Sequence, residues 1–454
     1  MLFNSFPFLF GFLPLVLAGY WLTARAEAVR VWFLVLASLV FYGWWDIGFM
    51  PLLLASVLLN WLAARLHEAS GRRGVIVLAV AGNLAVLAAY KYLAFFAGIL
   101  RDLAGLDVPA PAWALPLGIS FFTFHHIIYW ADRARGRAPL YSLRDYTLYI
   151  ALFPQILAGP LVRHSEIVHQ FRLPPGRPGW EERTARGTVL FIIGLSKKLF
   201  LADPLARMAE PVFAKANLGA LSAAEAWQGA LAFTGQIYFD FSGYSDMAIG
   251  LALLLGMTLP VNFEAPYRAA SLRDFWRRWH MTLSRFLRDY LYIPMGGNRF
   301  GLAVQCAALV ATMALGGLWH GAGWTFVAWG LAHGVALALG VLWRRALPPM
   351  PWPLGWALTL LFVAATWVLF RAESLDAAMA MLHAMADWRP WDGLPGWRTL
   401  VPALAIALLG PTSQQVAGAF RPRAWYAAAA AAATVAAVLT LNDGVAYEFI
   451  YFQF

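Results

Sequence analysis

The chain has 454 residues, of which 61% are hydrophobic and 13% are charged, and its mean hydropathy is +0.62. A soluble domain carries about 25% charged residues, so the composition excludes an ordinary soluble protein and indicates a polytopic membrane protein. The formal net charge is +10. Because the Arg and Lys residues lie mostly in short loops between apolar runs, they follow the positive-inside pattern, and we expect membrane lipids rather than nucleic acid as their partners.

The apolar runs are long and show no alternating pattern. A bilayer admits only helices or closed barrels, so the pattern predicts an all-α polytopic membrane protein. No soluble domain, long linker or repeat is evident, and residues 1–454 are predicted to form a single integral-membrane domain. The candidate spans are Phe8–Leu22, Val31–Trp45, Pro51–Ala64, Gly74–Tyr92, Trp113–Trp130, Thr147–Leu161, Gly187–Leu201, Trp227–Tyr244, Met247–Leu259, Leu302–Leu318, Gly323–Trp343, Leu354–Phe370, Leu400–Leu409 and Trp425–Leu441.

One early segment breaks the charge pattern. The loops after the first, third and fifth spans are rich in arginine, which predicts an N-terminus outside the cell membrane. The loop after Thr147–Leu161 is also rich in arginine, and Pro154, Gly159 and Pro160 interrupt that segment. We therefore expect a broken or re-entrant segment that returns to the cytoplasmic side. The alternative is an ordinary kinked span.

Two carboxylates occur in the stretch QIYFDFSGYSDMAIG. Asp240 and Asp246 lie between apolar runs, close to Tyr238. A carboxylate at membrane depth usually faces a bundle interior or a cavity. These residues are therefore expected either to line a polar tunnel or to form a structural hydrogen-bond network that joins two short helices.

A basic, aromatic stretch begins at Ser271. Its apolar residues recur every three or four positions, which predicts one amphipathic helix lying in the membrane interface. Its arginines either face headgroups and solvent or bind a phosphorylated donor, because guanidinium groups match phosphate geometry. The candidates for the donor phosphates are Arg277, Arg278 and Arg285.

Two histidines stand out in this half of the chain. His280 is predicted near the boundary between the two faces of the basic helix, as a structural residue or a catalyst. His320 lies in GGLWHGAG, where the glycines predict a helix end or break. A buried neutral imidazole there could act as a general base on a hydroxyl, and a structural role is the alternative. His125, His126 and His333 are expected to be structural.

Metal and cysteine chemistry are not indicated. The histidines show no i, i+4 pairing with a carboxylate, and no metal site is predicted. The single Cys306 excludes an internal disulfide.

The chain resembles the membrane-bound O-acyltransferases over nearly its whole length, and in particular the bacterial branch that contains the alginate O-acetylation membrane subunit. The resemblance rests on several motifs in the right order: MLFNSFPFLFGFLPL, FPQILAGPLVRH, QIYFDFSGYSDMAIG, FWRRWHMTLSRFLRDYLYIPMGGNR, GGLWHGAGWTFVAWG and FIYFQF.

The resemblance implies a ring of tilted transmembrane helices around a central tunnel, with re-entrant and interfacial helices, and a core motif region over residues 230–335. It implies catalytic roles for His320, which matches the family's invariant histidine, and for His280. The residues expected to line the tunnel are Trp279, Trp319, Tyr238, Asp240 and Asp246.

The resemblance also implies the reaction. An acetyl group would move from a cytoplasmic donor substrate, acetyl-CoA, across the bacterial inner membrane, with no cofactor bound. A periplasmic acetyltransferase of the SGNH type is the expected partner. It would modify a polysaccharide, for which alginate, peptidoglycan, cellulose and other exopolysaccharides stay open.

The C-terminal tail, residues 443–454, ends in FIYFQF. A similar ending occurs in the small membrane peptide of teichoic-acid D-alanylation, where a tyrosine resembles an acyl carrier. This resemblance implies that Tyr451 accepts acetyl with His320 as base. The alternative is an aromatic anchor at the membrane interface.

Two other function classes stay open. A transporter could use Asp240, Asp246 and the broken segment as its pathway, but transporters often show related halves and no repeat is evident. A non-catalytic scaffold would tolerate the loss of His320.

Overall fold

The computed structural model describes residues 1–109, 113–217, 221–387, 393, 396–421, 423–441 and 449–450. Helices dominate these residues and no β-strand occurs among them, so the predicted all-α fold is confirmed. The chain divides into two compact units, which are described separately. The prediction of a single domain over residues 1–454 stays a prediction.

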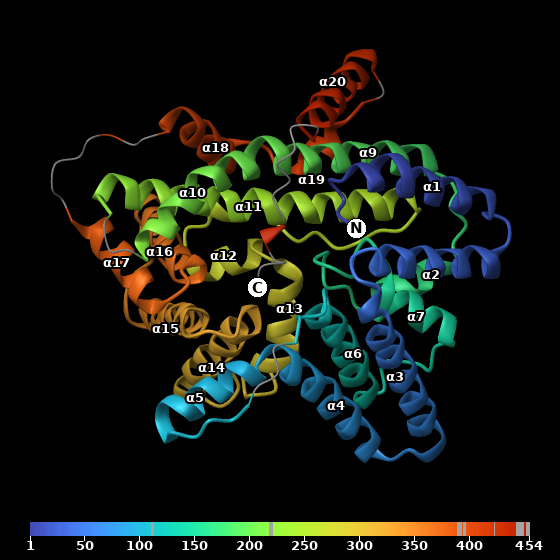
Figure 1. The fold of residues 1–454 in the computed structure, drawn as a ribbon, viewed down its shortest axis with the longest axis horizontal. Coiled ribbons are helices and arrows are strands. Elements are labelled where there is room, and N and C mark those ends of the chain that lie inside the picture. Colours follow the sequence, from blue (N-terminus) through green and yellow to red (C-terminus); the bar gives the residue numbers. More distant parts are fainter. Residues whose placement is uncertain are drawn as a thin grey trace. The chain divides into compact units, whose positions relative to one another are not determined.

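Unit 1 comprises Met1–Ile192, Tyr244–Pro260 and Ala424–Ala430. Within it α4 packs against α6 and α3, and α2 packs against α7 (Figure 1). Its helices are η1 (Pro7–Phe12), α1 (Leu13–Leu22), α2 (Glu27–Gly43), η2 (Ile47–Phe49), α3 (Met50–Ser70), α4 (Arg73–Lys91), α5 (Leu93–Ala104), α6 (Ile119–Ala134), α7 (Leu143–Ala151), α8 (His164–Ile167), η3 (Val168–Arg172) and most of α9 (Trp180–Ser196).

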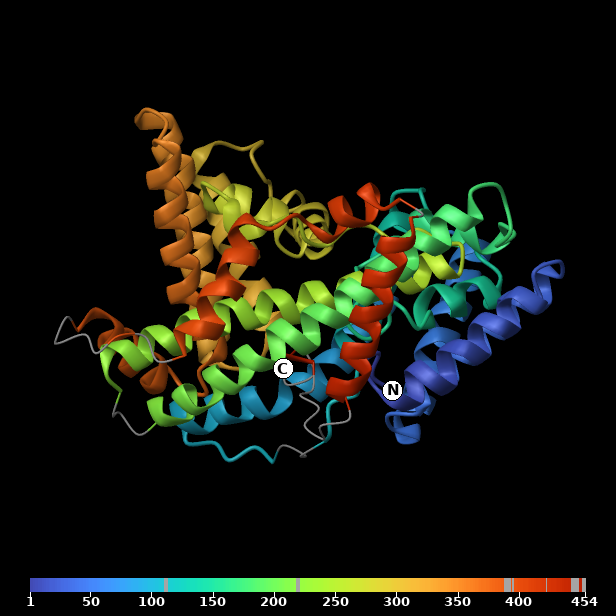
Figure 2. The same cartoon turned by 90° about the horizontal axis from the view of Figure 1, so that it is seen from above.

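Unit 2 comprises Ile193–Gly243, Val261–Arg423 and Ala431–Phe454. Here α15 packs against both α14 and α16, and α15 and α16 run side by side in Figure 2. Its helices are η4 (Lys197–Ala202), α10 (Asp203–Ala216), η5 (Pro266–Arg268), α12 (Leu272–Arg278), α13 (Met281–Leu287), η6 (Arg288–Tyr292), α14 (Leu302–His320), α15 (Trp324–Ala346), α16 (Trp352–Arg371), α17 (Leu375–Ala386), α18 (Trp397–Leu409) and α19 (Ser413–Ala419).

Six helical segments of the described residues are long and apolar enough to cross a bilayer, which confirms a multi-pass membrane protein. A seventh crossing is possible if α18 and α19, which meet at 67°, form one bent span. The tunnel implied by the family resemblance stays a prediction. The six segments are Ile47–Ser70, α4, α14, α15, α16 and α20 (Ala424–Leu441).

The prediction of two short spans around Asp240 and Asp246 is wrong. Residues Ala223–Leu254 form one continuous helix of 32 residues, α11, which contributes to both units. In unit 1 this helix packs very closely on α9, because a Cβ atom on Gly250 would lie 2.6 Å from the carbonyl oxygen of Gly187. The glycines of SGYSDMAIG therefore serve close helix packing, and they do not end a helix.

The predicted break in Thr147–Leu161 is confirmed. Helix α7 ends at Ala151, and no helix resumes before α8. The side chain of Gln155 donates to the backbone oxygen of Tyr149 at 2.7 Å, and Ser38 accepts from the backbone N–H of Phe153 at 3.2 Å. Side chains thus replace the lost helical bonds of a buried segment, as they must where water is absent. The side of the membrane to which the segment returns stays a prediction.

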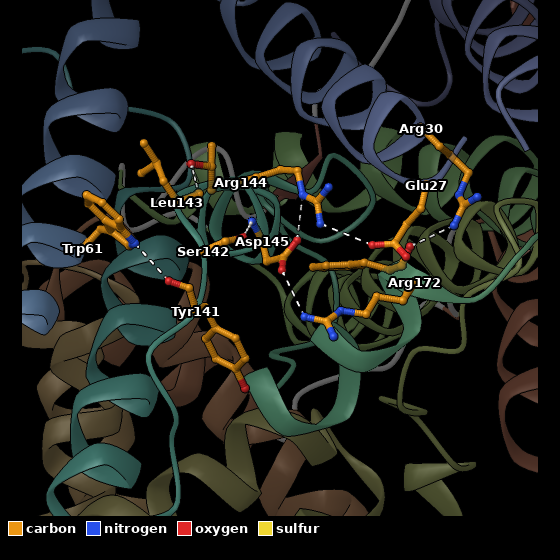
Figure 3. A network of polar contacts seen from close by, with 11 residues as sticks. Glu27, Arg30, Trp61, Tyr141, Ser142, Leu143, Arg144, Asp145 and Arg172 are labelled. Atoms are coloured by element: carbon orange, nitrogen blue, oxygen red, sulfur yellow. Dashed lines mark hydrogen bonds and ion pairs between the residues drawn. The ribbon is translucent and has the colours of Figure 1, made fainter. Parts of the chain in front are cut away.

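Arginines of unit 1 link helices α2 and α7 to the segment at η3 (Figure 3). Arg30 is buried and donates to the carbonyl oxygens of Phe171 at 3.2 Å and Leu173 at 3.3 Å. Asp145 pairs with Arg144 at 3.1 Å and with Arg172 at 3.8 Å. These cations bind groups of the protein itself, so the arginine-rich loops do more than set topology or attract headgroups.

Candidate functional site

His280 occupies a break between two short helices. Helix α12 ends at Arg278 and α13 begins at Met281. Between them His280 adopts φ 41° and ψ 54°, the left-handed conformation that is uncommon for any residue but glycine, although histidine, asparagine and aspartate adopt it more often than the others. The prediction of one continuous interfacial helix from Ser271 is therefore wrong. The strained backbone turns His280 into the protein, where its side chain is completely buried.

Asn262 stabilises the break between α12 and α13 and determines the tautomer of the His280 imidazole. Its side-chain oxygen accepts from the backbone N–H of Thr282 at 3.3 Å and from the Thr282 hydroxyl at 2.9 Å. Because a backbone N–H can only donate, the shared Asn262 atom must be the oxygen. The Nδ1 atom of His280 lies 3.1 Å from the same oxygen and must therefore carry a proton. In the neutral ring the lone pair is then on Nε2.

The surroundings of His280 keep it neutral. Phe241 meets the imidazole edge to face, with ring centroids 4.6 Å apart, and Phe263 lies on another side at 6.4 Å. Burial lowers the pKa of His280 from its ordinary value of 6.5 to about 3. At physiological pH His280 can therefore accept a hydrogen bond or a proton at Nε2 without carrying a charge beforehand.

His320 is the last residue of α14, which confirms the predicted helix end. The chain leaves the helix in an extended conformation at Gly321. The imidazole is 6% exposed and lies among three aromatic rings, with centroid distances of 4.8 Å to Trp319, 5.3 Å to Trp329 and 5.1 Å to Phe370. These rings hold the imidazole in one orientation inside an apolar pocket.

Glycines on α14 and α15 allow this pocket to close. A Cβ atom on Gly317 would lie 2.2 Å from the backbone oxygen of Phe326, and one on Gly330 would lie 2.3 Å from that of Met313. The two helices therefore touch backbone to backbone immediately before His320. Their close contact sets the position of Trp329, which comes from α15 and packs against the imidazole.

Both histidines contact the same indole ring. Trp319 lies 6.5 Å from the imidazole of His280 and 4.8 Å from that of His320, measured between ring centroids. From His320 aromatic contacts continue through Trp329 and Trp367 to Trp279 and then to Tyr238 on α11. Trp279, Trp319 and Tyr238, all predicted to line a tunnel, thus belong to one aromatic cluster with both histidines.

Asp240 has a different environment. Its carboxylate lies 2.8 Å from the ammonium of Lys198, which also lies 2.9 Å from Asp203. Its second oxygen accepts from the backbone N–H of Ile450 at 2.7 Å. These contacts favour a hydrogen-bond and ion-pair network for Asp240. The expected network between two short helices is therefore wrong in one respect, because Asp240 lies within the single continuous helix α11.

Comparison with known proteins identifies the family. The sequence profile of the membrane-bound O-acyltransferases matches residues 114–381, more than half of the chain, and this range holds both histidines and the aromatic cluster. The chain belongs to the membrane-bound O-acyltransferase family. The predicted membership is thus confirmed, and the protein is an acyltransferase.

Three relatives bear on which acyl group this acyltransferase transfers, and the two that cover most of the chain are named for O-acetylation. A peptidoglycan O-acetyltransferase of Helicobacter pylori is 39% identical over 85% of this chain and 80% of the relative. A probable alginate O-acetylase of Pseudomonas aeruginosa is 42% identical over 86% of this chain and 76% of the relative. A teichoic acid D-alanyltransferase of Streptococcus thermophilus is 26% identical over 50% of this chain and 57% of the relative. The protein is a membrane O-acetyltransferase.

The other residues predicted for the acyltransferase site are one aspartate and three arginines. Asp246 is buried on the continuous helix α11, six residues after Asp240, and its place in a tunnel stays a prediction. Among the candidate phosphate ligands, Arg278 pairs with Asp274 at 3.0 Å, Arg277 is exposed and Arg285 is half-buried. Their binding of donor phosphates stays a prediction.

Two of the histidines expected to be structural, His333 and His126, have contacts that fit this role. His333 accepts from the Trp276 indole at Nδ1, at 3.3 Å, and its Nε2 lies 3.0 Å from the Thr366 hydroxyl. His126 lies 2.7 Å from the Tyr146 hydroxyl. Tyr451, the candidate acyl carrier, lies outside the described residues, so its role stays a prediction.

Sequence reasoning missed three residues of this region. Asn262 lies in the irregular segment after α11, where no local pattern marks it. Lys198 and Asp203 did leave a signal, because two lysines interrupt an apolar run and an aspartate follows five positions after the second. In the π-helix η4 that spacing brings the two side chains together, since π-helical turns join residues five apart.

Proposed function

We propose that the protein moves an acetyl group from cytoplasmic acetyl-CoA across the bacterial inner membrane for O-acetylation of an extracytoplasmic polysaccharide of the alginate type. The observation that supports this most strongly is the contact of His280 and His320 with the same indole, inside a buried aromatic cluster. Such a site excludes water, so an acetyl group is protected from hydrolysis while it is transferred.

In this proposal His320 is the general base. Removal of a proton from an attacking hydroxyl by a positioned imidazole contributes roughly 10²–10⁴-fold to a rate. His280, neutral and with its lone pair on Nε2, is the second catalytic group and stabilises the donor or the departing proton. Arg277, Arg278 and Arg285 supply charge for the donor phosphates.

The first acceptor in this proposal is Tyr451. Its phenolic oxygen attacks the thioester carbon and His320 takes the phenolic proton. The C–S bond then breaks, and coenzyme A leaves as a thiolate that receives the proton. Support comes from the two described residues before Tyr451. Phe449 and Ile450 are buried, and Phe449 packs on Phe241 at 5.8 Å, the ring that contacts His280.

The second step needs an acceptor on the outer side. A hydroxyl of a periplasmic SGNH-type partner attacks the acetyl-tyrosine ester, which restores the phenol and carries acetyl to the polysaccharide. Alginate and peptidoglycan are the leading acceptors, because relatives named for each are 42% and 39% identical to this chain. The two acceptors are distinguished by measuring the acetylation of each polymer separately, with membranes that contain the protein and its partner.

Transfer of label from radioactive acetyl-CoA to the purified full-length protein tests the proposal. Wild type should become labelled, whereas His320→Ala and Tyr451→Phe should not. His169→Gln, which changes an exposed histidine, is the matched control and should label normally. Labelling of Tyr451→Phe at the wild-type level would exclude the tyrosine carrier. Normal polysaccharide acetylation by His320→Ala would instead favour a scaffold.

A further inference from the structure

Three buried charges form a cluster in unit 2. The ammonium of Lys198 lies between the carboxylates of Asp203, at 2.9 Å, and Asp240, at 2.8 Å. The three side chains are 5%, 7% and 2% exposed. Taking charges out of water costs free energy for each ion, and apolar residues of similar size often stabilise a fold better. The cluster is therefore a costly way to hold helices together.

The cluster has one contact that goes beyond these helices. The carboxylate of Asp240 uses one oxygen for Lys198 and the other for the backbone N–H of Ile450, at 2.7 Å. Ile450 and Phe449 are 1% and 3% exposed, and the Phe449 ring packs on Phe241, one residue after Asp240. The last described residues of the chain are thus bound through both main chain and side chain.

Hydrogen bonding and ring packing together select a position along the tail. A carboxylate that accepts from an N–H forms a charge-assisted hydrogen bond, which is about twice as strong as a neutral one. Every tail residue offers a similar backbone N–H, so the register is fixed by this bond together with the Phe449 ring, which a shift of one residue would take away from Phe241. Lys198 binds one carboxylate oxygen of Asp240 and so orients the other oxygen toward the Ile450 amide.

We propose that Asp240, oriented by Lys198, is a positioning residue that anchors the C-terminal tail at the Ile450 amide, and so sets the point from which Tyr451 reaches the histidine site. The anchor stands on the contacts of Asp240 alone. Its effect on acetyl transfer rests on the proposed function of Tyr451.

Hydrogen exchange at the Ile450 amide, resolved by residue in the full-length protein, tests the anchor without any substitution. The amide should exchange at least about tenfold more slowly than in an unstructured peptide of the same sequence, because a hydrogen bond to a buried charge must first open. Exchange at the rate of the free peptide would overturn the anchor, whatever the acetyl transfer experiment shows.

A pair of uncharged variants isolates the acceptor atom. Both carry Lys198→Met and Asp203→Asn, so neither leaves a buried charge unpaired; one adds Asp240→Asn and the other Asp240→Leu. The Asn variant keeps a side-chain oxygen for Ile450 and should retain part of the protection, whereas the Leu variant should lose it. Equal protection in both variants would overturn the role of the Asp240 oxygen.

Kinetics separate positioning from folding. In the Leu variant, kcat for acetyl transfer should fall at least about tenfold relative to the Asn variant, with KM for acetyl-CoA unchanged, because donor binding does not involve the tail. Loss of protection with unchanged kcat would overturn the positioning role. Protection in wild type without any label on Tyr451 would contradict the carrier proposal and leave the anchor intact.

Discussion

His280 lies at the start of one helix and His320 at the end of another, yet both imidazoles pack against the indole of Trp319. The distances between ring centroids are 6.5 Å and 4.8 Å. His280 precedes α13, whereas His320 ends α14. Two side chains at helix ends can face a common volume more easily than two from helix interiors, because their backbones leave room between the helices. We therefore expect the Trp319 indole to fix the distance between the two histidines.

Trp319→Leu should reduce acetyl transfer by about 10²-fold, since small displacements of reacting groups have effects of that size. The matched control is Trp324→Leu, which changes a tryptophan that is 54% exposed. We expect less than about a twofold change there, because the ring contributes little to the core. Transfer rates from radiolabelled acetyl-CoA provide the comparison, and equal losses in the two variants would argue against a special role for Trp319.

Asn262→Leu should destabilise the fold by about 2 kcal/mol, because the backbone N–H of Thr282 and the Nδ1–H of His280 lose their shared acceptor. It should also abolish acetyl transfer by freeing the imidazole to change tautomer or orientation. Thermal unfolding in detergent and labelling from acetyl-CoA report the two effects.

Asn83→Leu is the control for Asn262→Leu. Asn83 is also buried and exchanges two hydrogen bonds with Asn60, at 3.1 Å and 2.7 Å, in unit 1. We expect a similar loss of stability with transfer retained in the molecules that stay folded. If both variants lose transfer in proportion to stability, Asn262 has only a structural role.

Because His280 is buried, we expect the free energy of unfolding to decrease as the pH is lowered. Burial lowers its pKa from 6.5 to about 3 in the folded protein, so the unfolded chain takes up a proton first as pH decreases. The contribution of His280 is fully present above pH 6.5 and is lost as pH falls toward 3, by at most about 1.4 kcal/mol per pH unit. Unfolding midpoints at pH 7.5 and pH 5.0 measure it.

The variant His280→Asn removes the titrating ring and keeps a residue that tolerates the left-handed conformation. Its unfolding midpoint should drop less than that of wild type between the two pH values. Parallel acid sensitivity of the two proteins would show that other groups dominate.

Gly317→Ala should destabilise the helix pair α14–α15 by about 1–3 kcal/mol, because the added methyl group would lie 2.2 Å from the Phe326 carbonyl oxygen and must push the helices apart. Acetyl transfer should fall as well, since α15 carries Trp329. Gly82→Ala in α4 is the control, because no atom lies within 4 Å of the added position. Thermal unfolding should show no loss there, as alanine favours helix.

Arg277→Gln should raise KM for acetyl-CoA several-fold and leave kcat unchanged, if the exposed guanidinium binds the donor phosphates. With acetyl-pantetheine, which lacks the nucleotide phosphates, the substitution should have no effect. Arg278→Gln should act more weakly, because Arg278 already pairs with Asp274 at 3.0 Å. An equal rise in KM for both donors would show that Arg277 does not bind phosphate.

Much of this protein follows from local features of its sequence. Composition alone places it in a membrane, because so few charges cannot cover a soluble surface. The glycines around His320 correctly predict a helix end, and the prolines after α7 correctly predict a break, since both residue types act on their own backbone. The motifs also identify the family, which the sequence profile confirms.

Other features depend on residues far apart in the chain, and no local pattern reveals them. The helical periodicity around His280 continues through the break, which arises because Asn262 binds Thr282 and His280 from another segment. Asp240 is expensive to bury alone, and it becomes stable only when folding brings Lys198 and the Ile450 amide to it. Local propensity acts within a few residues, whereas a buried hydrogen bond or ion pair takes whichever partner the packing of the helices supplies.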